Sequence, residues 1–67
     1  MDSKAIGQRL IKLRGDRTQE EVSRDIGVSV SAIGMYERGE RIPRDEVKLA
    51  LARYYDTTVQ AIFYTDE

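Results

Sequence analysis

The sequence predicts an all-α domain built from five helices. Apolar residues recur at steps of three and four along most of the 67-residue chain, which is the spacing of one helix face. Glycine, proline or an Asp-Thr-Thr run interrupts this pattern at short intervals, and no segment shows the apolar–polar alternation of a strand. A chain of this length forms one small domain, residues 1–67, whose core is marginal and can need a partner subunit.

The first helix is expected over residues 4–14. Ile6, Leu10 and Leu13 follow one another at steps of four and three and form its apolar face. Ser3 can cap the N-terminus, and a Gly-Asp pair stops the helix after its last residue.

The second helix starts after Thr18. The Thr18 hydroxyl can accept a hydrogen bond from the backbone of Glu21, whose carboxylate can reach back, so the two residues form a capping box. Val22 and Ile26, four positions apart, give the helix one apolar face. Gly27 ends it, because glycine adopts a left-handed conformation at little cost.

A third helix is expected over residues 29–38. Ser29 serves as its N-cap, and Ile33 and Tyr36 point inward. With the preceding helix it forms a helix-turn-helix over residues 18–38, whose second helix can lie in the major groove of DNA.

The outward face of this third helix carries small or polar residues and one methionine. At about 100° per residue, four residues lie roughly 100° to 160° away from Ile33: Ser31, Gly34, Met35 and Arg38. A solvated surface is the simplest interpretation of such a face. The outward methionine favours a contact surface, because its neighbours at core spacing point the other way.

Two more helices complete the chain. Residues 43–55 are predicted to be helical, with Pro43 at the first position and Asp45 and Glu46 near the positive N-terminal end. Two inward stripes are open for this helix: Val47, Leu51 and Tyr54, or Leu51, Ala52 and Tyr55. Thr58 can cap a last short helix, which carries Val59, Ile62 and Phe63.

The composition argues against an enzyme. Without cysteine or histidine, the chain has no disulfide, no thiolate nucleophile, no imidazole base and no zinc site of the usual kind. The acidic residues are scattered, so no metal site is expected, and no cofactor-binding motif is present. No apolar run approaches the roughly 20 residues that span a bilayer, and the first residues resemble no signal peptide. We therefore expect a cytoplasmic protein without a membrane partner.

The net charge of −1 is the strongest argument against a nucleic-acid partner, because non-specific DNA affinity comes mainly from neutralised phosphates. The charge is unevenly distributed. Residues 1–17 carry a net +3, residues 18–44 a net −1 and residues 45–67 a net −3. Such a gradient is consistent with one end that faces an anion and another that faces solvent or a partner.

From Ile6 to Phe63 the chain resembles the lambda-repressor/Cro-type helix-turn-helix family of bacterial and phage regulators, also called the xenobiotic-response-element family. The segments that carry this resemblance are LRGDRTQEEV at 13–22, IGVS at 26–29, AIGMYERGERIPR at 32–44 and YYDTTVQAIF at 54–63. The resemblance implies a compact five-helix lambda-repressor-like domain, a short double-stranded DNA operator as partner, and a homodimer.

The resemblance also implies roles for individual residues. Gln19 corresponds to the family's glutamine that contacts a phosphate and braces the recognition helix. Arg14 and Glu37 correspond to an ion pair between the ends of the first and third helices. Base-edge and groove contacts are implied for Ser29, Val30, Ser31, Ala32 and Met35. Contacts with the DNA backbone are implied for Arg38, Arg41 and Arg44.

Two departures from the family pattern affect the helix-turn-helix. Ser23 stands where the family more often has alanine, and its hydroxyl needs a partner. Gly34 lies inside the recognition helix, where glycine costs roughly 1 kcal/mol relative to alanine. This glycine could leave the helix loose until DNA orders it.

These features predict a sequence-specific transcriptional regulator, most simply a repressor that occupies an operator. Direct readout would be sparse, because the centre of the helix lacks the residues that form bidentate pairs with bases. The alternative is a protein-interaction module of the same fold, such as an antitoxin-like or anti-repressor-binding protein. For either function, Ile62, Phe63 and Tyr64 are candidates for a homodimer interface, since one short helix cannot bury three large side chains in a row.

Overall fold

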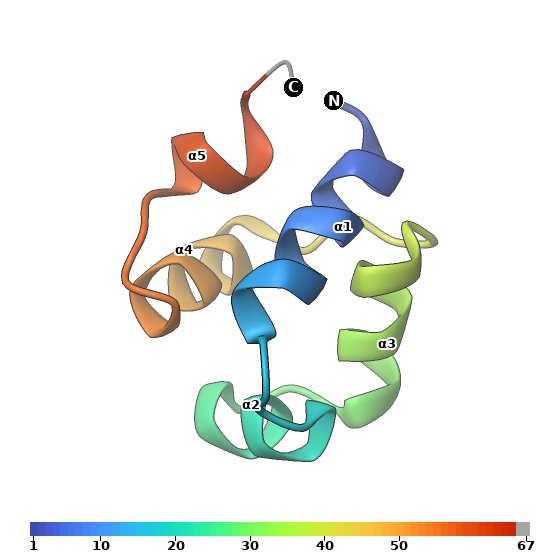
Figure 1. Ribbon diagram of the computed structural model, residues 1–67, viewed down its shortest axis with the longest axis vertical. Helices are drawn as coiled ribbons and strands as arrows, with labels where there is room; N and C mark the ends of the chain where they lie inside the picture. Colours follow the sequence, from blue (N-terminus) through green and yellow to red (C-terminus); the bar gives the residue numbers. More distant parts are fainter. Residues whose placement is uncertain (66–67) are drawn as a thin grey trace.

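Five α-helices and short connections make up residues 1–65, the part of the chain that the computed structural model describes (Figure 1). The predicted all-α, five-helix architecture is confirmed. The helices are α1 (Ser3–Arg14), α2 (Gln19–Ile26), α3 (Val30–Arg38), α4 (Asp45–Tyr54) and α5 (Val59–Phe63).

Helix α1 begins one residue earlier than predicted. Its N-cap is Asp2 rather than Ser3: one carboxylate oxygen of Asp2 accepts hydrogen bonds from the backbone N–H groups of Lys4 (3.1 Å) and Ala5 (3.2 Å). A carboxylate at this position satisfies two otherwise unpaired donors and also lies at the positive end of the helix dipole. The expected cap, Ser3, is instead the first helical residue.

Helix α4 begins two residues later than predicted. Arg44, its N-cap, has an extended backbone (φ −67°, ψ 163°), so Pro43 lies before the helix and not at its first position. Asp45 and Glu46 do occupy the first turn, where their charges favour the helix dipole. The buried face of α4 is the stripe of Leu51, Ala52 and Tyr55, and the alternative stripe is only partly buried at Val47 and Tyr54.

The core lies between α1 and the helices around it. Helix α1 packs against α3 and α5, α2 packs against α3 and α4, and α4 packs against α5. Figure 1 shows α3 on one side of α1 and α4 and α5 on the other. The largest fully buried side chains are Phe63, Ile6, Leu51, Ile62 and Val22.

A glycine in α1 permits close contact with α3. A Cβ built on Gly7 would collide with the backbone carbonyl of Glu37 and would lie 3.0 Å from that of Tyr36. Backbone atoms cannot move aside as the end of a side chain can. Gly7 therefore sets the spacing between α1 and α3, and through it the position of α3.

The C-terminal helix corrects the predicted dimer interface. Ile62 and Phe63 are 1% and 2% exposed, because α5 turns both side chains into the core against α1 and α4. Only Tyr64 of the three is exposed, at 47%. The Tyr64 hydroxyl accepts a hydrogen bond from the buried Lys48 ammonium (2.9 Å), which also lies 5.6 Å from the centre of the Phe63 ring.

Candidate nucleic-acid interface

Helix α2 is held at both of its ends, by a capping box at its N-terminus and by Gly27 and a Ser23 hydrogen bond at the turn that leads to α3. The capping box is present: the Thr18 hydroxyl accepts from the Glu21 backbone (3.0 Å), and the Glu21 carboxylate accepts from the Thr18 backbone (2.8 Å). Gly27 adopts the left-handed conformation (φ 77°, ψ 32°). The Ser23 hydroxyl, which needed a partner, donates to the carbonyl of Val28 (2.6 Å). These contacts fix the direction in which α3 leaves the turn.

Helix α3 separates a buried face from an exposed one. The Ser29 hydroxyl caps the helix by accepting from the backbone of Ala32 (3.0 Å). Ile33 and Tyr36 are 2% and 5% exposed and belong to the core. Burial of these two side chains determines which face of α3 remains open.

The open face contains most of the residues for which base contacts were expected. Ser29, Val30 and Ser31 are exposed, and Met35 is partly exposed. Ala32 is the exception and corrects the expectation: it is only 8% exposed and belongs to the hydrophobic core. Packing in the core covers most of its surface, so the Ala32 methyl group offers little contact area to a base.

A charged network holds the C-terminal end of α3 against α1 and α2. Arg14 donates to both carboxylate oxygens of Glu37, through Nε (2.7 Å) and Nη2 (3.1 Å), and Gln19 donates to the same carboxylate (2.8 Å). The structure thus brings Arg14 and Glu37 together as expected and places Gln19 where it braces α3. The hydrogen bond to Glu37 raises the pKa of Arg14 above its ordinary value.

The burial of this network makes it important for stability. Glu37 is only 4% exposed, and the Arg14 side chain is 21% exposed. A buried carboxylate is tolerated only when it is paired and hydrogen-bonded. Glu37 meets this condition through two different helices, so the network fixes the orientation of α3 relative to the rest of the domain.

The arginines expected at the DNA backbone lie in different surroundings. Arg41 and Arg44 are exposed, whereas Arg38 forms a two-point ion pair with Glu40, through Nε (3.0 Å) and Nη2 (3.1 Å). This contact raises the pKa of Arg38 and lowers that of Glu40. The sequence reasoning missed Glu40, although an acid two residues after an arginine at a helix end was a usable signal.

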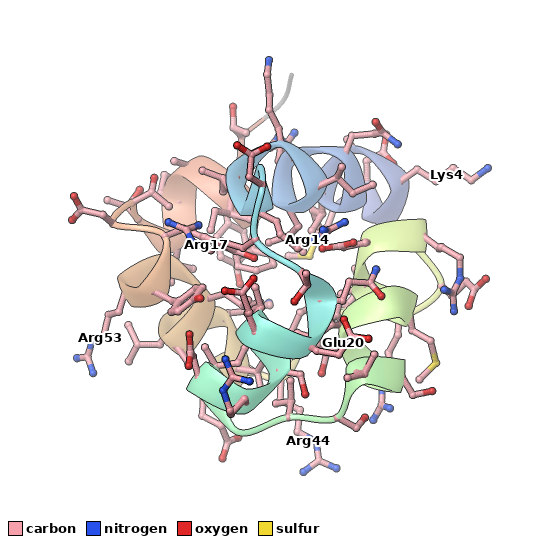
Figure 2. All side chains as sticks on the ribbon, turned by 60° about the horizontal axis from the view of Figure 1, so that its bottom comes forward. Lys4, Arg14, Arg17, Glu20, Arg44 and Arg53 are labelled. Carbon is pink, nitrogen blue, oxygen red and sulfur yellow. The ribbon has the colours of Figure 1, made fainter. Side chains whose placement is uncertain are left out.

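The labelled cations do not form one continuous basic surface. In Figure 2, Lys4 extends on the same side of the molecule as α3, Arg53 points away on the opposite side, and Arg44 projects from the lower edge. Arg14 is turned toward Glu37. The candidate interface therefore depends on the outer face of α3 more than on a broad positive field.

Comparison with known proteins identifies the family. The profile of the Helix-turn-helix family matches residues 8–62. The chain belongs to this lambda-repressor/Cro-type helix-turn-helix family. No curated protein and no solved structure matches the chain.

Membership of this helix-turn-helix family gives the α2–α3 unit its general role. The family is a DNA-binding, non-enzymatic one, and the matched range contains the whole of α2 and α3. In such proteins the second helix of the motif enters the major groove. Within residues 1–65, no helix is long and apolar enough to cross a membrane.

Proposed function

We propose that this protein is a sequence-specific transcriptional repressor that occupies an operator with α3 in the major groove. The observation that carries the proposal is the division of α3 into two faces. One face is buried and locked through Glu37, while Ser29, Val30 and Ser31 on the other remain open to solvent. A rigid helix with an open outer face is the part that a helix-turn-helix inserts into DNA.

The open face suits a small number of base contacts. The Ser31 hydroxyl can donate to or accept from several base edges, while Val30 and Met35 offer apolar contact to a thymine methyl group. Ser29 and Gln19, at the N-terminal ends of α3 and α2, are suited to phosphate contacts, as are the exposed Arg41 and Arg44. Phosphate contacts position the protein, and the outer face of α3 supplies the sequence preference.

We further propose that the repressor acts as a homodimer in the cytoplasm. Tyr64 supports this part of the proposal, because it is 47% exposed and follows α5, a helix that packs mainly against α1 and α4. Figure 1 shows α5 and α3 on opposite sides of α1, so an interface at Tyr64 leaves α3 free. Two copies can then present recognition helices about 34 Å apart to successive major grooves.

Selection of bound sites from a random duplex pool, followed by a salt titration, tests the proposal. A dimeric reader yields a palindromic consensus, and log K falls steeply with log salt because phosphate contacts release counterions. A reporter with the selected site inside its promoter should be silenced. An interaction module that serves only a protein partner, such as an anti-repressor, would enrich no site and show no salt-dependent affinity for DNA.

A further inference from the structure

The side chain of Arg38 lies back over its own helix, across Gly34. A Cβ built on Gly34 would be only 2.9 Å from Nη1 of Arg38, so the guanidinium occupies the space that a side chain at position 34 would take. The two residues are four positions apart, and helical side chains point toward the N-terminus. The Arg38 guanidinium is therefore displaced by about one turn from its own Cα toward the middle of α3.

This position explains why a glycine lies inside the recognition helix. Glycine in a helix interior costs roughly 1 kcal/mol relative to alanine, and Gly34 has an ordinary negative φ, because it is absent from the residues with positive φ. Backbone conformation therefore does not require glycine here. The Arg38 guanidinium occupies the space of a Cβ at this position, so a side chain there would displace this flexible group from its place over the helix.

Glu40 holds the guanidinium by one edge and leaves the other free. Its carboxylate accepts from Nε and Nη2 of Arg38, which uses the side edge of the planar group. One N–H of Nη1 and the second N–H of Nη2 form the end edge, and within residues 1–65 Nη1 donates no hydrogen bond. The side chains of Arg38 and Glu40 are 59% and 55% exposed, so the ion pair lies at the surface, where a ligand can approach it.

The end edge of an arginine matches one base in particular. Guanine presents two acceptors, O6 and N7, in the major groove, and arginine donates to both in a bidentate contact. A guanidinium held in one plane loses less conformational freedom on forming such a contact than a free one does. Arg38 lies about 140° from Ile33 on α3, on the outer face that also carries Ser31 and Met35.

We propose that Arg38 reads a guanine in the major groove, with Glu40 as the residue that positions it and Gly34 as the residue that makes room for it. This inference rests on the proposed DNA-binding function and names the base that the site prefers. It replaces the expectation that Arg38 contacts the DNA backbone. Arginine can bind a phosphate through the same planar fork, so the test must separate a base contact from a backbone contact by its dependence on sequence.

Arg38→Lys tests the proposal directly, because it keeps the charge and removes the bidentate fork. The probe is the duplex that the parent protein selects from a random pool. Replacement of one G·C pair in one half-site by A·T should weaken the parent by roughly fivefold to 150-fold. Arg38→Lys should discriminate between the two duplexes much less than the parent, because an ammonium is a point charge without the planar fork. Replacement of the same guanine by 7-deazaguanine, which lacks the N7 acceptor, should also weaken the parent and leave Arg38→Lys unchanged.

Two further variants separate positioning from folding. Gly34→Ala should melt at the same temperature as the parent or higher, since alanine is the better helix former, and should still lose the guanine preference. Glu40→Gln alone should abolish the guanine preference, and it should have no further effect on this preference when it is added to Arg38→Lys. Glu20→Gln is the matched control, because it makes the same charge change at an exposed glutamate of α2 that does not hydrogen-bond Arg38. This variant should retain the guanine preference.

The outcomes distinguish this inference from the proposed function. A guanine preference that survives Arg38→Lys, or an equal loss on all sequences, assigns Arg38 to a phosphate and overturns the inference while DNA binding stands. If both Gly34→Ala and Glu40→Gln retain the guanine preference, Gly34 does not make room for the guanidinium and Glu40 does not position it. A parent protein that enriches no site and binds no duplex refutes the inference and the proposed function together.

Discussion

Arg14→Met should destabilise the domain more than any other single change in the charged network. The variant leaves the Glu37 carboxylate, which is 4% exposed, with only the hydrogen bond from Gln19. Loss of one partner of a buried ion pair costs about 3–5 kcal/mol. Since the Arg14 side chain is 21% exposed, and water can partly replace it, we expect the lower end of that range, about 3 kcal/mol.

Such a loss is large for a domain of this size. At about 0.05–0.15 kcal/mol per residue, the whole free energy of unfolding is roughly 3–10 kcal/mol. A domain of this length loses about 4–8 °C in melting temperature per kcal/mol, so Arg14→Met should melt roughly 12–24 °C below the parent. Glu37→Gln should cost less, about 1–2 kcal/mol, because the stranded Arg14 can turn toward solvent.

The melting temperature and the free energy of unfolding of both single variants and the double variant can be measured by thermal and urea unfolding, followed by circular dichroism. If the two residues are coupled, the double variant loses less stability than the two single variants combined. An Arg14→Met protein that melts within a few degrees of the parent would refute the reasoning. So would strict additivity in the double variant, because it would mean that the two charges act independently.

Four other predictions address the rest of the molecule. Burial, with a smaller contribution from the Glu37 charge, raises the pKa of Tyr55 to about 12 from an ordinary value of 10.0. The free energy of unfolding should therefore be unaffected by this group below pH 10 and should fall as the pH rises toward 12. In unfolding experiments at a series of alkaline pH values, Tyr55→Phe should reduce this fall. Gly7→Ala should lower the melting temperature despite alanine's better helix propensity, because its Cβ meets backbone of α3; an unchanged melting temperature would contradict the close approach. Met35→Ala should change which sequences are bound. Arg41→Ala should instead weaken binding to all sequences alike and reduce the slope of log K against log salt by about one unit. Competition binding with selected and random duplexes measures both effects. Sedimentation at micromolar concentration should show a dimer for the parent and a monomer for Tyr64→Ser, and a parent that stays monomeric would exclude the proposed interface.

The positions of the helices and of the DNA-binding motif could be predicted from the sequence alone. These features depend on residues within a few positions of one another. The capping box at Thr18, the left-handed Gly27 and the cap at Ser29 were all predictable, because a cap involves a side chain and a backbone group three residues away. The family was recognisable for the same reason, since its motifs are runs of adjacent residues.

Even local signals competed at the ends of helices. Asp2 and Ser3 are both good capping residues, and the choice between them depends on one residue of register. Pro43 suits the first position of a helix, but the backbone of Arg44 remains extended and α4 starts afterwards. Sequence propensity identified both helices and misplaced each start by one or two residues.

The accessibility of individual side chains could not be predicted in this way, because burial depends on neighbours that are distant in the sequence. The family resemblance implied a base contact for Ala32, yet the packed domain buries it, and α5 turns Ile62 and Phe63 inward while Tyr64 stays exposed. The same holds for the position of Arg38. Its sequence neighbours allowed either a free arginine or a paired one, and only the path of the chain after α3, which brings Glu40 back beside the helix, fixes the guanidinium above Gly34.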